Sequence, residues 1–332
     1  MDTLLLTDNE VKNLLTISDV IKAVELSFKE KGLNQVQMPA KIYLHFNKNK
    51  GDLRTMPAFL ERLDISGVKI VNVHPENPTK NGMPTVMATI LLIDPKTGFP
   101  LCIMGGTTIT NMRTGAAVAV ATKYLANKDW KTVGFIGGGA QAKTSLSALL
   151  AINDQIDEVR VWSRTEKTRK KFVDDAKKTF ENVNNFVSSS SIRKTLSDVD
   201  IVVTTTPSRK PIVEANMISE GMHINCIGAD AAGKQELDPK ILVKSRVVVD
   251  DWMQAAHSGE INVPIQSGLI DRSHIAAEIG EVIAGLKPKR QTKKEITVFV
   301  STGLAVQDVV TAKLAYDKAK EKKIGHLFRI AY

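Results

Sequence analysis

The chain has 332 residues, of which 43% are hydrophobic and 24% charged, and its formal net charge is +9. This composition is typical of a globular protein long enough for two domains, and no segment approaches the roughly 20 uninterrupted apolar residues that cross a bilayer. The basic residues are scattered and aromatic residues make up only 5% of the chain, which argues against nucleic-acid binding. We therefore expect a soluble protein with no nucleic-acid or membrane partner, whose positive field favours small anions.

The start of the chain and its cysteines predict a cytoplasmic location. Asp2 stands where a secretion signal would be basic, so we expect no targeting segment. Cys102 and Cys226 each lie in an apolar run. This placement is typical of small buried side chains in a reducing compartment rather than of a disulfide.

The first third of the chain mixes short helices and strands. Apolar residues at helical spacing predict a helix over residues 17–32. Alternating or apolar runs predict strands over residues 42–46, 67–73, 85–93 and 100–104. Strands joined by turns are typical of the antiparallel or mixed sheet of an α+β domain.

The pattern changes near residue 114. An alanine-rich helix is predicted over residues 114–125, and apolar strands then alternate with helical stretches such as 169–179. Such alternation predicts a parallel sheet covered on both faces. A long final helix over residues 303–322 is expected to pack back on the first domain, and the basic run 287–294 is expected to be a solvated loop. The predicted strands are 132–136, 158–162, 200–205, 223–227, 246–249 and 296–300.

A glycine-rich turn, Gly137-Gly138-Gly139-Ala140, follows the strand over residues 132–136 and begins a helix. Gly137 permits a tight turn, Gly139 lets the backbone approach a pyrophosphate, and the small Ala142 lets helix and strand come close. Free N–H groups at the helix start would then face the phosphates. In this context we predict a dinucleotide site, although glycine clusters also form plain turns.

The end of the second strand of this domain bears on which nicotinamide is bound. NAD-binding folds of this type place Asp or Glu there, to hold the ribose 2′-hydroxyl. Here Ser163, Arg164 and Thr165 follow the strand over residues 158–162. Two hydroxyls and a guanidinium suit a 2′-phosphate, so we expect an NAD(P) cofactor with a preference for NADP(H) and Arg164 as the discriminating contact. The alternative is a solvated turn with Thr165 as a helix cap.

Ordered motifs along nearly the whole chain resemble the ornithine cyclodeaminase/mu-crystallin family, and within it the archaeal alanine dehydrogenases. Members of that family include cyclodeaminases, amino-acid dehydrogenases, cyclic imine reductases and a hormone-binding crystallin. The motifs are Gln37–Lys41, Gly51–Ala58, Val68–Asn72, Gly82–Val86, Arg113–Ala117, the glycine turn through Gln141, Thr204–Ser208, Ile227–Asp230, Gly259–Ile261 and Ser301–Ala305.

The resemblance implies an α/β fold with two domains and a homodimer. A Rossmann-type parallel-sheet domain would span residues 116–300, and a discontinuous α+β domain for substrate binding and dimerisation would span 1–115 and 301–332. One departure concerns Gly105 and Gly106, which stand where similar relatives often carry an acid. If that acid helps to hold a diamino substrate, ornithine is less expected here.

Hydride chemistry on an amino acid needs cations for the carboxylate and a group that moves protons. Arg54 and Arg113 suit the first task because a guanidinium grips a carboxylate with two hydrogen bonds; the alternative for each is a surface salt bridge. Lys69 lies in an otherwise apolar strand. If it faces inward, burial and a neighbouring arginine would lower its pKa and make it an acid/base, whereas its alternative place is the outward side of the strand. Lys41 could support Lys69 or hold the carboxylate.

Asp230 follows an apolar strand at the carboxyl end of the predicted sheet, where ligands bind in such folds. Its carboxylate could hold the substrate amine, or it could cap a helix that begins at Ala231. The six histidines show no metal-ligand spacing, so we expect no metal. The expected cofactor-binding residues are Arg113, Gly137, Gly139, Ala140, Gln141, Ser163, Arg164, Thr165, Thr205 and Ser301.

Together these features predict an NAD(P)-dependent dehydrogenase that converts a small L-amino acid, L-alanine, to pyruvate and ammonia. Two enzymatic alternatives use the same pocket chemistry: ornithine cyclodeaminase, in which the hydride returns to the product, and a reductase of cyclic imines such as pyrroline-2-carboxylate. A crystallin-like ligand-binding protein is the alternative from outside the enzymes. Lys69, Arg113 and Asp230 argue against it, because a binder has no need of all three.

Overall fold

The computed structural model describes residues 2–181 and 183–330 and divides the chain into two compact units. The first unit contains the residues up to Arg113 and those from Leu304 onward, and the second runs from Thr114 to Gly303. Helix α4 (Thr107–Leu125) begins in the first unit and continues into the second. In the described part of the chain, no helix is both long and apolar enough to span a membrane.

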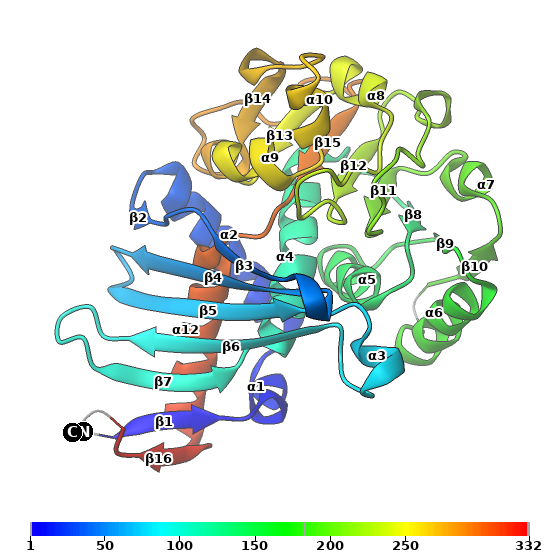
Figure 1. Ribbon diagram of the computed structural model, residues 1–332. Coiled ribbons are helices and arrows are strands. Elements are labelled where there is room, and N and C mark those ends of the chain that lie inside the picture. The colour runs from blue at the N-terminus through cyan, green and yellow to red at the C-terminus, as the bar shows by residue number, and fades with distance from the viewer. Residues whose placement is uncertain (1, 182, 331–332) are drawn as a thin grey trace. The chain divides into compact units, whose positions relative to one another are not determined.

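The first unit is built on a mixed sheet with the strand order β16-β1-β7-β6-β5-β4-β2, and β3 pairs with β4 (Figure 1). Strand β1 runs parallel to β7, whereas the other pairs are antiparallel. The mixed α+β character expected from the sequence is therefore confirmed. The strands are β1 (Thr3–Leu6), β2 (Val36–Gln37), β3 (Ile42–Phe46), β4 (Gly51–Leu60), β5 (Ile65–Val73), β6 (Val86–Ile93), β7 (Pro100–Gly105) and β16 (His326–Phe328).

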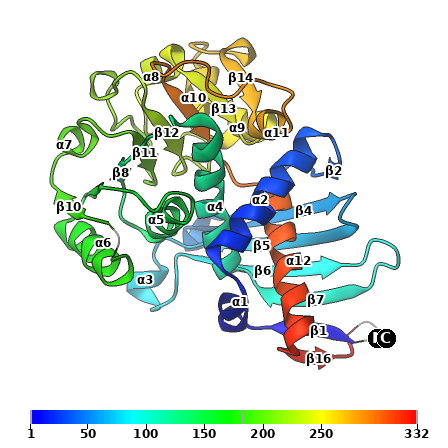
Figure 2. The same ribbon diagram turned by 180° about the vertical axis from the view of Figure 1, so that it is seen from behind.

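Two long helices, α2 (Ile17–Gly32) and α12 (Ala305–Lys322), lie together across one face of this sheet (Figure 2). Helix α2 buries the apolar stripe that its spacing predicts, including Val20, Val24 and Phe28. Helix α12 is buried along most of its first half and packs on α2, β4, β5 and β6, so the end of the chain covers the sheet formed by its beginning. The shorter helices of this unit are α1 (Asp8–Leu14) and α3 (Asn77–Lys80).

In the second unit, the described residues form a parallel sheet with the order β10-β9-β8-β11-β12-β15-β13-β14. The order reverses between β8 and β11, and ligands bind beyond the carboxyl ends of the strands at such a point. The predicted parallel-sheet fold is confirmed, but its edge strands β10 and β14 were not predicted, because polar residues interrupt their apolar pattern. The strands are β8 (Thr132–Ile136), β9 (Glu158–Trp162), β10 (Asn185–Ser189), β11 (Ile201–Thr204), β12 (His223–Cys226), β13 (Arg246–Val249), β14 (Ile275–Glu278) and β15 (Thr297–Val300).

Both faces of this parallel sheet are covered. Alternate residues of β11 show this: Ile201 and Val203 join one core with helices α4, α5 and α6, whereas Val202 joins a second core with α7 and α8. Cys226 lies in the second core as a buried free thiol, and Cys102 is also free and buried. The helices of this unit are α5 (Ala140–Ile152), α6 (Glu166–Thr179), α7 (Ile192–Leu196), α8 (Pro239–Lys244), α9 (Trp252–Ser258), α10 (Asn262–Gln266) and α11 (Ile279–Ile283).

The basic run over residues 287–294 is largely exposed, but the prediction of a solvated loop is wrong for Arg290. Its guanidinium donates hydrogen bonds to the carbonyl of Leu125 at 2.7 Å, the carbonyl of Met222 at 3.2 Å and the hydroxyl of Thr297 at 2.9 Å. One arginine therefore ties the end of helix α4 to the entry of strands β12 and β15.

This contact predicts unequal effects of two neighbouring substitutions. Arg290→Ala should lower the free energy of unfolding by about 1–3 kcal/mol, because it removes the hydrogen bonds that the guanidinium donates to the Leu125 and Met222 carbonyls and to the Thr297 hydroxyl. Lys289→Ala, in the same run but exposed, should change it by no more than about 0.5 kcal/mol. Denaturant unfolding of both variants measures the difference, and equal stabilities would show that Arg290 has no structural role.

Candidate functional site

Lys69 occupies a core position of the first unit. Along β5 the buried residues Ile65, Gly67, Lys69 and Val71 alternate with more exposed ones, so the Lys69 side chain lies on the face that α12 covers. Its exposed fraction is 1%. The alternative of an outward-facing lysine is therefore wrong.

The carboxylate of Asp308, on α12, joins Lys69 to Arg113. The Lys69 Nζ lies 2.7 Å from Asp308 Oδ2, and Arg113 Nε donates to Asp308 Oδ1 at 3.0 Å. Arg113 Nη1 also donates to Gln307 Oε1 at 3.2 Å, and that oxygen accepts the Leu304 N–H as well. All these side chains are buried, and Asp308 is fully buried. Arg113 is thus in an ion pair, but not in the surface salt bridge that was its alternative.

Burial and charge together set the protonation of Lys69. The pKa of Lys69 is lowered to about 7: burial is the largest cause, the charges of Arg113 and Lys41 act in the same direction, and the Asp308 carboxylate opposes them. Two cations share one anion in a medium that solvates ions poorly, so the ammonium gives up its proton near neutrality. A lysine in this state can both donate and accept a proton at physiological pH.

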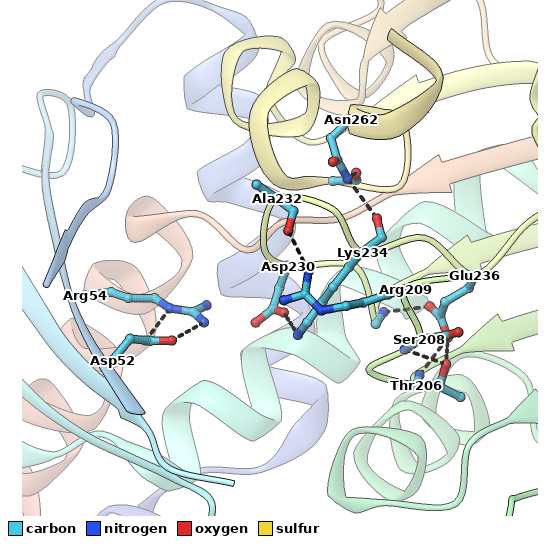
Figure 3. A network of polar contacts seen from close by, with 12 residues as sticks. Asp52, Arg54, Thr206, Ser208, Arg209, Asp230, Ala232, Lys234, Glu236 and Asn262 are labelled. Carbon is cyan, nitrogen blue, oxygen red and sulfur yellow. Dashed lines mark hydrogen bonds and ion pairs between the residues drawn. The ribbon is translucent and has the colours of Figure 1, made fainter. Parts of the chain in front are cut away.

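Arg54, on β4, is held by a neighbour on its own strand. Its Nε and Nη2 donate to the two carboxylate oxygens of Asp52 at 2.8 and 3.1 Å, as Figure 3 shows. The guanidinium carbon also lies 5.2 Å from the ring centroid of Tyr43. Arg54 is buried, as Arg113 is. The alternative prediction for Arg54, a salt bridge at the surface, is therefore wrong. Its role toward a substrate stays a prediction.

The glycine turn of the second unit has the geometry that a dinucleotide requires. Gly137 has φ +111°, and a Cβ there would lie 2.4 Å from the Thr205 hydroxyl oxygen, so no other residue fits. A Cβ on Gly139 would contact nothing within 4 Å, so this position faces open space. Gly139 is the N-cap of α5, whose first residues are Ala140 and Gln141. Their N–H groups begin the helix at the switch point of the sheet.

A pocket of about 450 Å³ lies over this turn. The Thr205 hydroxyl is buried there, and it has no hydrogen-bond partner among the described residues. A ligand bound over the glycine turn could accept a hydrogen bond from the Thr205 hydroxyl and so provide the missing partner. The residues present therefore fit the expected nicotinamide dinucleotide. The lining residues are Gly137, Gly138, Gly139, Trp162, Ser163, Arg164, Thr165, Thr168, Thr205, Thr206, Pro207, Ser208 and Ile212.

Two of the remaining predicted cofactor residues, Thr165 and Ser301, have structural partners of their own. Thr165 is the N-cap of α6 and accepts the Thr168 N–H at 3.3 Å, so the helix-cap alternative holds for this residue. Arg164 lines the pocket and is exposed. Ser301 follows β15, and its hydroxyl lies 3.4 Å from Oδ2 of the buried Asp250. Asp250 also accepts the Thr302 N–H, which fixes this segment.

Asp230 lies in a loop after β12, and its carboxylate is paired with Lys234 Nζ at 2.5 Å (Figure 3). A turn, not a helix, follows it, so the helix-cap alternative is wrong. The loop is anchored by the fully buried Asn262, whose side chain accepts the Gly233 N–H and donates to the Lys234 carbonyl, both at 2.8 Å. Asp230 is therefore a partly exposed carboxylate in a fixed loop.

Sequence reasoning missed the residues that hold these groups. Gln307 and Asp308 stand in an apolar run of the last helix, and a charge within such a run is the signal that could have found them. Lys234 had no such signal. Among residues 2–181 and 183–330, no cluster of three or more metal-ligating side chains occurs.

The chain belongs to the ornithine cyclodeaminase/mu-crystallin family, whose sequence model matches residues 1–323. It is 49% identical over 325 residues to the alanine dehydrogenase of Archaeoglobus fulgidus, and the match covers 98% of each chain. A structure of an archaeal alanine dehydrogenase dimer with bound NAD matches at a TM-score of 0.94 with 48% identity, over 99% of this chain and 100% of that one. The structure of the Thermococcus litoralis Δ1-pyrroline-2-carboxylate reductase, in complex with NADH and L-proline, matches at a TM-score of 0.93 with 41% identity. The match covers 98% of this chain and 99% of that one.

The charges around Lys69 predict opposite shifts for two substitutions. Asp308→Asn removes the anion that raises the pKa of Lys69, so this pKa should fall below about 7; Arg113→Gln removes a cation and should raise it. The ¹³Cε signals of lysine-labelled protein, assigned with Lys69→Arg, report each midpoint, and melting temperatures confirm that the variants are folded. Shifts of the same sign, or none, would contradict this network.

Proposed function

We propose that the protein is an NAD(P)-dependent oxidoreductase that oxidatively deaminates a small L-amino acid, L-alanine, in a reversible reaction. The observation that carries the proposal is Lys69, fully buried and paired with the Asp308 carboxylate that also binds Arg113, with a pKa of about 7. The likeness to an alanine dehydrogenase and to an imine reductase supports the same class of reaction.

Each side chain has a role in this proposal. Arg113, Arg54 and Lys41 hold the substrate carboxylate, and Lys69 takes a proton from the substrate ammonium, because the amine must be neutral before hydride can leave Cα. Asp230 holds the nitrogen and stabilises the iminium that forms. The cofactor, held by the glycine turn and Thr205, supplies the hydride acceptor. Water then adds to the imine, and ammonia departs to leave pyruvate.

The space around Gly105 and Gly106 favours a monoamino substrate. A Cβ on Gly105 would lie 2.6 Å from the backbone nitrogen of Asp8, and one on Gly106 would lie 2.9 Å from Cγ1 of Ile90. An acidic side chain at either position would therefore require α1 or β6 to shift. The acid that similar relatives carry here is therefore absent, and without it a second substrate amine has no partner at these positions, which argues against ornithine. A cyclic imine reductase remains the second candidate, favoured by the 41% identity to a reductase that was solved with L-proline.

A crystallin-like binding role finds less support. Burying a lysine beside an arginine and a carboxylate costs desolvation energy, and a site that only stores a ligand gains nothing from a lysine that titrates near neutrality. The relatives named above include enzymes from two activity classes.

The proposal predicts that the absorbance of reduced cofactor falls when the protein is mixed with pyruvate and ammonium. Lys69→Ala should slow this turnover by roughly two to four orders of magnitude, the range of lost acid–base assistance, with cofactor affinity unchanged. Faster loss with pyrroline-2-carboxylate would make the protein an imine reductase. Ornithine turnover without net cofactor change would make it a cyclodeaminase, and ligand binding without turnover would make it a binding protein.

For the cofactor we propose that NADP(H) is preferred over NAD(H). Arg164 lines the pocket beside the hydroxyls of Ser163 and Thr165, and in the described turn from Trp162 to Thr165 no carboxylate follows β9. The solved relatives contain NAD or NADH, so this preference would set the chain apart from them.

Two substitutions separate a specific contact from general charge. Arg164→Ala should weaken NADPH binding by one to two decades, since a charge-assisted contact contributes on the order of 1.5–3 kcal/mol, and should leave NADH binding nearly unchanged. Lys167→Ala, also exposed and three residues away, should have little effect on either. Fluorescence titrations of both reduced cofactors measure these affinities. Tighter binding of NADH than of NADPH by the parent protein would overturn the proposed preference.

We also propose that the protein forms a homodimer through its first unit. Ile42 and Leu44 on β3 are 62% and 54% exposed, which is unusual for neighbouring apolar side chains on one strand face. The dimeric archaeal relative supports this assembly.

A further inference from the structure

Two glutamates of the second unit, Glu236 and Glu260, are buried to 0% and 1% exposure without taking part in the chemistry proposed above. Glu236 ends the loop over residues 228–236, which carries Asp230 and Lys234, and Glu260 lies just before α10. Buried carboxylates are costly, so each is expected to have a role that compensates its desolvation.

The Glu236 carboxylate joins the cofactor pocket to this loop. It accepts hydrogen bonds from the Thr206 N–H and the Thr206 hydroxyl, each at 2.7 Å (Figure 3). It also accepts the Thr204 hydroxyl at 2.7 Å and the Gly228 N–H at 3.0 Å. Thr206 lines the pocket, and Thr205 lies between its two anchored neighbours. A Cβ on Gly228 would lie 2.5 Å from Glu236 Oε2, so this close contact requires glycine.

Glu260 holds this loop at its carboxyl end. Its carboxylate accepts the Glu236 N–H at 2.8 and 3.0 Å and the Leu237 N–H at 2.7 Å. Asn262 binds the loop through Gly233 and Lys234. The loop is therefore fixed at its end by Glu260, in its middle by Asn262, and against strands β11 and β12 by Glu236.

The hydrogen-bond pattern distinguishes the two carboxyls. Each oxygen of Glu236 accepts one N–H, and an N–H cannot reverse its direction, so the anion fits this place best. Burial raises the pKa of Glu236 to about 7, and burial together with the Glu236 charge raises the pKa of Glu260 well above its usual value. Both N–H groups that Glu260 accepts reach its Oε1, so its Oε2 can carry a proton while each N–H keeps an acceptor, and we assign the proton of the pair to Glu260.

We propose that Glu236 is a positioning residue, whose carboxylate, supported by Glu260, fixes two parts of the unit as one rigid piece: the segment Thr204–Thr206, which leads into the cofactor pocket, and the Asp230–Lys234 loop. Its effect on catalysis acts through Thr206 and Asp230. This inference rests on the proposed function, because Asp230 is assigned to the substrate nitrogen there.

The test compares Glu236→Gln with Glu260→Gln. A glutamine at 236 turns N–H groups toward Thr206 N–H or Gly228 N–H, so kcat should fall by about a hundredfold, the effect of a misplaced reacting group. The KM for the amino acid should stay within about a factor of three, because other residues hold its carboxylate. Amide exchange at Thr206 and Gly228 should become faster. In Glu260→Gln the amide resembles the protonated acid, so kcat should fall less than in Glu236→Gln. Thr204→Val removes one hydrogen-bond donor of Glu236 and should lower kcat least.

Exposed Glu214, which pairs with Arg193 at the surface, provides the control: Glu214→Gln should match the parent in all measurements. A lowered melting temperature of Glu236→Gln with an unchanged kcat per folded molecule would overturn the proposal and leave Glu236 merely structural. Absence of turnover in the parent protein would instead overturn the proposed function. In that case amide exchange and cofactor affinity still test the inference. It would be contradicted if Glu236→Gln changed neither of them.

Discussion

The burial of the Lys69 ammonium against the Asp308 carboxylate is the interaction on which the first unit depends. The last helix of the chain must return to the sheet formed at its beginning for this contact to exist, because Lys69 lies on β5 and Asp308 on α12. A buried ion pair contributes little net stability, since desolvation offsets attraction. Its consequence is chemical instead: burial, together with the charge of Arg113, lowers the pKa of Lys69 to about 7, and the Asp308 carboxylate keeps it from falling further.

The second unit uses buried polar groups in a related way. Its parallel sheet brings the ends of β8, β11 and β12 to one edge, where Gly137, Thr205 and the loop of Asp230 lie. Glu236 connects the last two of these by accepting the Thr204 hydroxyl, the Thr206 N–H and the Gly228 N–H. In each unit, a buried carboxylate thus fixes a group to which we assign chemistry: Asp308 fixes Lys69, and Glu236 fixes the loop of Asp230.

Much of the fold follows from local pattern. Period-two alternation and apolar runs predict β3, β5 and the central strands of the parallel sheet, and glycine chemistry predicts the turn at Gly137. The edge strands β10 and β14 escape such reasoning because polar residues interrupt their apolar pattern. The site divides similarly: Lys69 stands out as a charge in an apolar strand, but its partner Asp308 lies 239 positions later, and only the tertiary fold brings the two together. Glu236 and Glu260 were missed for the same reason.

The central claim is that Lys69 exchanges protons with substrate near neutral pH. Single-turnover hydride transfer, followed by cofactor absorbance across a series of pH values, tests it most directly. In the oxidative direction the neutral amine of Lys69 must accept the proton, so the rate should rise with pH through a midpoint at about 7. A rate with no midpoint near neutrality, or the same midpoint in Lys69→Arg, would contradict the account.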